Sequence, residues 1–116
     1  MSLGTTAMSA VAASPQPVVQ PARSAPLKIY ISGKYYDKEN AKVSVYDHGF
    51  LYGDGVFEGM RSYGGKVFRL KAHLDRLWAS AKAIWLKMPV SQEEMTKAVN
   101  ETLATNGIKD GYIRLW

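Results

Sequence analysis

From about Lys28 onward, hydrophobic and polar residues alternate with the period of two that is typical of a β-strand. Lys28–Ser32 alternates around isoleucine and tyrosine. Gly33-Lys34 then predicts a tight turn into Tyr35-Tyr36. We therefore expect a short hairpin at this point, followed by a compact, glycine-rich turn with a helical step over Asp47–Gly55.

A second alternating stretch, Gly55–Tyr63, predicts a strand that turns at Gly64-Gly65 and returns over Lys66–Leu70. One face of this strand carries Phe57, Gly59, Arg61 and Tyr63, and the other carries Val56, Glu58, Met60 and Ser62. A face with arginine and glycine is unusual for a plain core. A glycine inside a strand often marks a close approach of a ligand or another backbone.

Two helices are predicted next from the 3.6-residue period. Over Lys71–Leu86 one apolar stripe holds Leu70, Leu74, Leu77, Trp78, Ala81, Ile84 and Trp85. Arg76 lies on the opposite side, among the small residues Ala72, Ala79 and Ala83. The second helix covers Ser91–Asn106, with a capping box formed by Ser91 and Glu94, a stop at Asn106-Gly107, and an inner face of Met95, Val99, Thr102 and Leu103.

Gly111–Trp116 predicts a last strand, on which Tyr112 and Arg114 share one face. The order of strands, two helices and a strand predicts an α+β fold, with a mostly antiparallel sheet packed with two helices. Residues 1–27 are rich in Ala, Ser, Pro, Val and Gln, and we expect them to form a disordered leader. Residues 28–116 then form one domain.

The amino-acid composition excludes only a few classes of binding partner. The chain of 116 residues has a net charge of +5, but its lysines are scattered, so we expect no nucleic-acid partner. It contains no cysteine, which suits the cytoplasm, and we see neither a metal signature nor an apolar run long enough to span a membrane.

Four motifs in a fixed order make the chain resemble the class IV pyridoxal-phosphate aminotransferases. They are a Gly-Asp-Gly turn, a Phe-Glu-Gly-x-Arg strand, a His-x-x-Arg-Leu helix and a Tyr-x-Arg strand, at residues 53–55, 57–61, 73–77 and 112–114. The resemblance covers about residues 28–116 and implies the small N-terminal domain of that fold. It further implies a homodimer or higher homo-oligomer that acts on amino acids and 2-oxo acids.

Within the family, the strand and the closing Tyr-x-Arg resemble the branched-chain amino acid aminotransferases. This implies transamination of leucine, isoleucine and valine with 2-oxoglutarate or glutamate through pyridoxal 5'-phosphate. Two alternatives of the same fold remain open. The D-amino-acid aminotransferases usually lack the glycine at Gly59, and the aminodeoxychorismate lyases match the Phe-Glu-Gly-x-Arg strand less well.

The resemblance also implies a role for single residues. Arg76 matches the arginine that binds the cofactor phosphate, for which a guanidinium fork is well suited; helix periodicity alone favours a solvated surface arginine. Phe57 and Gly59 match the wall of the substrate pocket, where Gly59 would leave room beside the cofactor. Ordinary strand packing is the alternative for these two.

Arg61, Tyr112 and Arg114 match polar positions near the substrate carboxylates. The alternative for the two arginines is an interior ion pair with Glu58 or Asp110. Tyr52 matches a tyrosine that reaches into the pocket of the partner subunit, and the alternative is a tyrosine buried under the glycine-rich turn.

No catalytic residue is expected in this chain. Transamination needs a lysine that binds the cofactor covalently, and in this family it lies in a larger second domain, beyond Trp116. The chain by itself would then be inactive. An alternative from another class is a non-catalytic binding or assembly module.

Overall fold

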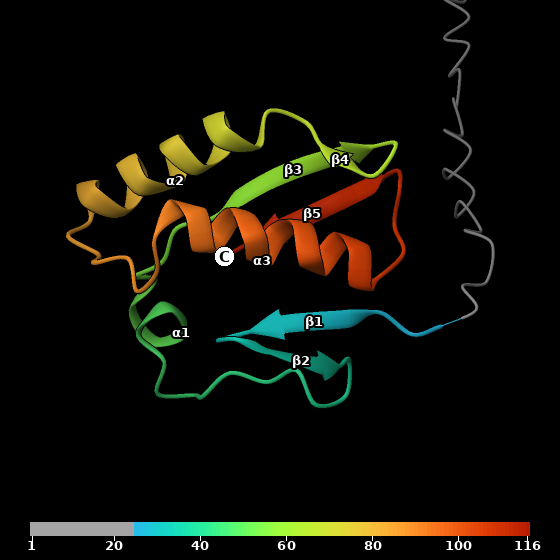
Figure 1. The fold of residues 1–116 in the computed structure, drawn as a ribbon. Coiled ribbons are helices and arrows are strands. Elements are labelled where there is room, and N and C mark those ends of the chain that lie inside the picture. Colours follow the sequence, from blue (N-terminus) through green and yellow to red (C-terminus); the bar gives the residue numbers. More distant parts are fainter. Residues whose placement is uncertain (1–24) are drawn as a thin grey trace, which may run out of the picture.

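The computed structural model describes residues 25–116, whose course is drawn in Figure 1. The predicted disordered leader falls almost entirely on residues 1–24, which lie outside the described part. Eight elements follow: β1 (Lys28–Ile31), β2 (Lys34–Asp37), α1 (His48–Tyr52), β3 (Glu58–Tyr63), β4 (Lys66–Val67), α2 (Leu70–Ala83), α3 (Gln92–Thr105) and β5 (Gly111–Leu115).

The first two strands form the predicted hairpin, with Ile31 opposite Lys34 in an antiparallel ladder. Its turn is one residue earlier than the sequence indicates. Ser32 and Gly33 both have positive φ, 49° and 88°, which is the backbone of the primed turns that suit twisted hairpins. Lys34 therefore already belongs to β2.

The other three strands form a second antiparallel sheet in the order β4-β3-β5. Gly59 lies opposite Arg114, and Arg61 lies opposite Tyr112. The predicted strand over Gly55–Tyr63 starts only at Glu58, and its return is limited to Lys66–Val67. The return is short because Arg69 adopts a left-handed conformation, with φ of 53°, and α2 begins at the next residue.

Helix α2 buries Leu74, Leu77 and Ala81, as the apolar stripe predicts. The prediction is wrong at its end, because the helix stops at Ala83 and does not reach Leu86. Trp85 has a positive φ of 60° and is 95% exposed, so it leaves the stripe and points into solvent. Residues 83–86 contain no glycine or proline that would signal the end of the helix.

Helix α3 has the predicted capping box: the Ser91 side chain accepts from the Glu94 backbone N–H, and the Glu94 carboxylate accepts from the Ser91 N–H. Its buried residues are Val99 and Leu103. At the other end, the Asn106 side chain accepts from Lys28 N at 2.7 Å and donates to Lys28 O at 3.0 Å. The last turn of α3 is thereby hydrogen-bonded to β1.

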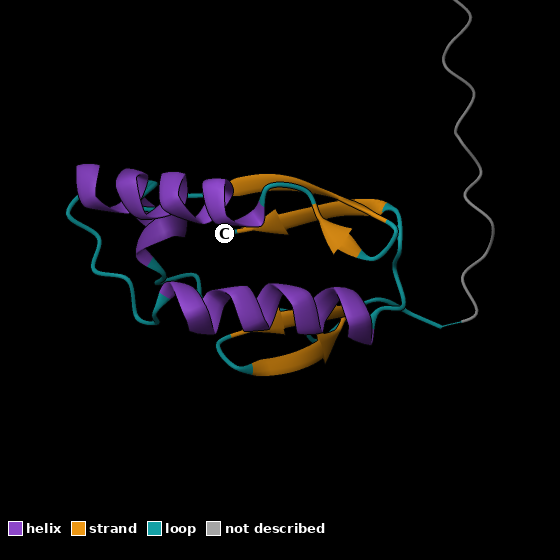
Figure 2. Ribbon diagram, turned by 45° about the horizontal axis from the view of Figure 1, so that its top comes forward, coloured by secondary structure: helices purple, strands orange, loops and turns teal. Residues whose placement is uncertain are grey.

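The layers confirm an α+β fold whose strand pairs are antiparallel in the described residues. Figure 2 shows α3 between the hairpin and the layer that α2 forms with the three-stranded sheet. The core lies between these elements and consists of Met60, Leu74, Leu77, Ala81, Val99 and Leu103. Within residues 25–116, no helix is long and apolar enough to cross a bilayer.

Candidate functional site

Strand β3 separates two chemically different faces, as its alternation predicts. Glu58, Met60 and Ser62 are buried on the inner face, against α2. Arg61 is exposed on the outer face, where the register with β5 places Arg114 beside Gly59 and Tyr112 beside Arg61. The predicted substrate residues on β3 and β5 therefore gather on one open surface.

Gly59 allows a close approach, but the neighbour is a residue of the same chain. A Cβ atom at Gly59 would lie 3.1 Å from Cζ of Tyr112 and would collide with its hydroxyl oxygen. The Tyr112 ring thus lies across Gly59 and occupies the space that, by the family resemblance, would be left free beside the cofactor. Tyr112 is 56% exposed, so the ring can move when another group needs this room.

The two arginines of the outer face lie close to aromatic rings. Cζ of Arg114 lies 3.8 Å from the centroid of the Phe57 ring, which is cation–π geometry, and Cζ of Arg61 lies 5.8 Å from that of Tyr63. Neither arginine forms an ion pair within residues 25–116. The interior ion pair that the sequence left open is therefore absent, since Glu58 faces the other way.

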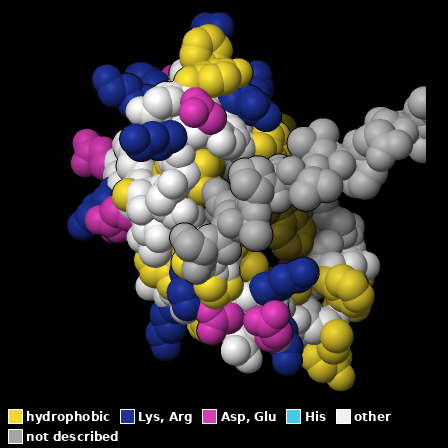
Figure 3. All heavy atoms as spheres, turned by 90° about the vertical axis from the view of Figure 1, so that its right-hand side faces the viewer, with side chains coloured by type: hydrophobic (Ala, Val, Ile, Leu, Met, Phe, Trp, Pro, Cys, Tyr) yellow, Lys and Arg dark blue, Asp and Glu magenta, His cyan; other side chains and the backbone are white. Residues whose placement is uncertain are grey.

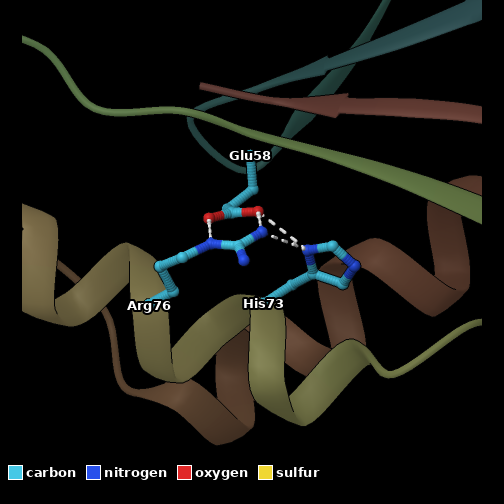
Figure 4. A network of polar contacts seen from close by, with 3 residues as sticks. All are labelled: Glu58, His73 and Arg76. Atoms are coloured by element: carbon cyan, nitrogen blue, oxygen red, sulfur yellow. Dashed lines mark hydrogen bonds and ion pairs between the residues drawn. The ribbon is translucent and has the colours of Figure 1, made fainter.

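Arg76 lies on α2 and meets the buried carboxylate of Glu58 (Figure 4). Its Nε donates to Glu58 Oε1 at 2.6 Å, and its Nη2 donates to Oε2 at 2.7 Å. Nδ1 of His73 lies 2.7 Å from the same Oε2. The hydrogen bonds from Arg76 and then His73 outweigh burial and lower the pKa of Glu58 from 4.5 to about 2, so this carboxylate stays ionised.

A hollow of about 310 Å³ opens beside this cluster and is lined by Phe68, Arg69, Ala72, His73 and Arg76. The third guanidinium nitrogen of Arg76, Nη1, is turned away from Glu58 and makes no hydrogen bond to the described residues. Ala72 keeps the approach open, and Arg69 adds a second cation. This donor set fits a phosphate group.

Tyr52 lies on α1, a single helical turn that Asp47 caps at its start and Gly53, with φ of 73°, at its end. The Tyr52 side chain is 69% exposed and stacks edge-on against His48 at 5.3 Å. The alternative of a buried tyrosine is therefore wrong. The Trp116 indole packs closely against two glycines, one within this turn and one after it. A Cβ atom at Gly49 or at Gly55 would lie 3.2 Å from the indole ring.

Sequence reasoning did not identify Glu58 as part of the site. The signal was present, because a carboxylate on the same strand face as Met60 and Ser62 must find a partner when that face is buried. Arg76 and His73, three residues apart on α2, are suitable partners. The sequence does not state, however, that α2 crosses this face of β3.

Figure 3 shows charged side chains of both signs on one face of the molecule. Lys and Arg side chains are interspersed there with Asp and Glu and do not collect into one basic patch. Within the described residues, no three His, Cys, Asp or Glu side chains gather as a metal site would require.

The described residues thus form an α+β domain with a buried ion pair, an exposed guanidinium edge and an open aromatic face. Known proteins identify it more closely. The family described as amino-transferase class IV matches residues 55–116, just over half of the chain, and the protein belongs to this family.

Curated relatives in this family carry different names. A protein of Methanocaldococcus jannaschii named "Putative branched-chain-amino-acid aminotransferase" is 57% identical over 89 residues, which cover 77% of this chain and 31% of that protein. An aminodeoxychorismate lyase of Bacillus subtilis is 41% identical over 87 residues (75% and 30%), and a D-alanine aminotransferase of Staphylococcus haemolyticus is 40% identical over 86 residues (74% and 30%).

A solved structure shows the same fold. The branched-chain aminotransferase of Thermoproteus uzoniensis, crystallised with norvaline, superposes with a TM-score of 0.71 at 46% identity, over 78% of this chain and 32% of that one. The chain spans about a third of the length of the relatives it matches.

Proposed function

We propose that this chain is the small N-terminal domain of a branched-chain amino acid aminotransferase. The parent protein would transfer the amino group of leucine, isoleucine or valine to 2-oxoglutarate through pyridoxal 5'-phosphate. One observation supports the proposal. Arg76 faces the inner side of β3 with one guanidinium edge not bound to Glu58, and the outer side is an open face of aromatic rings and of two arginines that form no ion pair within residues 25–116.

Each side has a proposed role. Arg76 holds the cofactor phosphate with the guanidinium edge that Glu58 does not use. Phe57 and Gly59 form the apolar wall for a branched side chain. Arg61, Tyr112 and Arg114 receive substrate carboxylates, and the exposure of all three lets them rearrange between leucine, with one carboxylate, and glutamate, with two.

The cofactor, when bound by the parent protein, supplies the electron sink that labilises the bond between the substrate α-carbon and its hydrogen. The lysine that holds the cofactor and moves this proton is proposed to lie in the second domain, beyond Trp116. The present residues would orient the phosphate and the substrate carboxylates and would exclude water, but would perform no covalent step.

A homodimer completes the proposed site. Tyr52 extends from α1 into solvent and could enter the pocket of a partner subunit, as the tyrosine of the family does. A cytoplasmic location is proposed as well, because a chain without cysteine is compatible with a reducing compartment.

The proposal is tested on the full-length protein loaded with pyridoxal phosphate. We expect leucine to bleach the absorbance band of the bound cofactor and 2-oxoglutarate to restore it. Bleaching by D-alanine with no response to leucine would assign the protein to the D-amino-acid branch. Release of pyruvate and 4-aminobenzoate from aminodeoxychorismate would assign it to the lyases, and no cofactor binding at all would favour the assembly module.

The phosphate role of Arg76 has its own test. Arg76→Gln keeps one donor for Glu58 but removes the guanidinium, so the Kd for pyridoxal phosphate should rise about tenfold to a hundredfold. The Kd for pyridoxal, which lacks the phosphate, should stay nearly constant. An unchanged ratio of the two constants would exclude the role.

A further inference from the structure

Glu58 has an environment that is uncommon for a carboxylate. It is 5% exposed and lies on the inner face of β3 beside Met60 and Ser62, which are almost fully buried. Both of its oxygens accept from Arg76, and His73 adds a third contact to Oε2. A carboxylate accepts hydrogen bonds and cannot donate them, so Nδ1 of His73 is the donor in this contact.

Stability alone is a weak explanation of this cluster. Replacing a buried ion pair by apolar residues of similar volume is often neutral or stabilising. The pair is moreover asymmetric, because the Glu58 side chain is 6% exposed whereas that of Arg76 is 66% exposed. One end of the pair is thus fixed in the core, and the other is presented to the hollow.

The asymmetry has a consequence for Arg76. A free arginine side chain samples many rotamers and loses this freedom when it grips a ligand. Here two of the three guanidinium nitrogens are already fixed by Glu58, in a planar fork, and the third stays available. The ordering of the guanidinium is therefore complete before any anion arrives.

We propose that Glu58 is a positioning residue for the cofactor phosphate, acting through Arg76. This inference rests on the proposed function, because it requires Arg76 to bind the phosphate. Glu58 also stands between Phe57 and Gly59 on the chain, so the strand that carries the substrate wall is the one that holds the phosphate-binding arginine in place.

One effect opposes the proposal and makes it testable. The negative charge of Glu58 reduces the positive potential in the hollow and by itself disfavours an anion. If this repulsion exceeds the benefit of a fixed guanidinium, neutralising Glu58 would strengthen phosphate binding. The sign of the change therefore decides between the two effects.

The experiment measures Kd for pyridoxal phosphate and for pyridoxal in the cofactor-free full-length protein. We expect Glu58→Gln to raise the Kd for pyridoxal phosphate roughly tenfold, equivalent to one lost charge-assisted hydrogen bond, and to leave that for pyridoxal unchanged. In an Arg76→Gln background the same change should have no further effect. Ser62→Ala, on the same buried face, is the matched control and should alter neither constant.

Three results would overturn the inference: unchanged or tighter binding of pyridoxal phosphate in Glu58→Gln, an equal weakening of both ligands, or the same loss in the Arg76→Gln background. If Arg76→Gln itself leaves the ratio of the two constants unchanged, the proposed phosphate role fails first and the inference fails with it. Should Glu58→Gln not fold, Glu58→Met removes the charge with an apolar side chain of similar length, and the same outcomes apply.

Discussion

Gly59 and Tyr112 together determine how much free space there is on the outer face of β3. Gly59→Ala would place a methyl group against the Tyr112 ring, 3.1 Å from its Cζ. Since the ring is exposed, it should swing away, and the free energy of unfolding should change by less than about 1 kcal/mol. We expect KM for leucine to rise in the full-length protein, because Tyr112 no longer lies beside the substrate wall.

Denaturant unfolding and steady-state kinetics check this prediction together. A larger loss of unfolding free energy would show that the ring cannot move. An unchanged KM would show that its position does not matter to the substrate.

Glu58 should give the chain a distinct acid sensitivity. Its folded pKa of about 2 lies below its ordinary value of 4.5, so its contribution to stability is complete above 4.5 and is lost as the pH falls toward 2. The size of the shift corresponds to at most roughly 3–4 kcal/mol. We expect wild type to be more stable than Glu58→Gln at neutral pH, and the two to converge near the lower value.

Denaturant unfolding at several pH values measures this difference. Comparison with Glu58→Gln is needed because the pKa values of Asp75 and Glu94 are lowered too. Ser62→Ala should run parallel to wild type at every pH. A Glu58→Gln curve that also runs parallel would mean that Glu58 does not titrate with folding.

Residue periodicity correctly places Arg61 on the face of its strand opposite Glu58 and Met60, and Tyr112 and Arg114 on one face of theirs, because a strand alternates strictly. It does not reveal that Tyr112 covers Gly59. That contact depends on the register between β3 and β5, which are separated along the chain by two helices. The ion pair between Glu58 and Arg76 could not be predicted from the sequence for a similar reason, because it depends on which face of β3 is covered by α2.

Asn106 links helix α3 to strand β1 through hydrogen bonds of its side chain. It ends α3 and bonds both backbone groups of Lys28 as well as Thr102 O. Asn106→Ala should therefore lower the free energy of unfolding by about 1–3 kcal/mol, because the Lys28 groups lose their partners.

Hydrogen exchange can locate this effect. Amides of the β1–β2 hairpin should exchange faster in Asn106→Ala, while those of β3 and β5 should keep their protection. Asn100→Ala, an exposed position on α3, serves as the control and should change little. Equal acceleration in both sheets would contradict a local link.

Element ends show where local sequence signals suffice. The Ser91–Glu94 capping box and the Gly64-Gly65 turn were predictable because each is complete within a few residues. The end of α2 was not, because Trp85 takes a left-handed conformation that tryptophan rarely adopts. The apolar period continues through it, so the sequence predicts a longer helix.

Considered as a whole, the molecule leaves many aromatic side chains uncovered. Phe57, Tyr112 and Trp116 are each more than half exposed around the sheet, and Tyr52 is so on α1. Apolar surface on this scale is typical of a face that another domain or subunit covers. The proposed dimer and second domain would both account for it.

Mixed dimers can test which subunit Tyr52 serves. In a dimer of one Tyr52→Ala subunit and one Arg76→Gln subunit, a Tyr52 that reaches across leaves one site with both native residues. Random mixing makes half of the dimers mixed, so activity should recover to about a quarter of wild type. If Tyr52 serves its own subunit, every site keeps one defect and mixing restores nothing.

The hydrogen bonds between Lys28 and Asn106 also bear on how the chain is made. They join residues 78 positions apart, and an isolated two-stranded hairpin is only marginally stable in water. At about 5–20 residues per second, roughly 4–16 s of synthesis separate the two partners. During this interval the hairpin lacks its helix, and translation speed sets how long its tyrosine-rich strands stay exposed to chaperones.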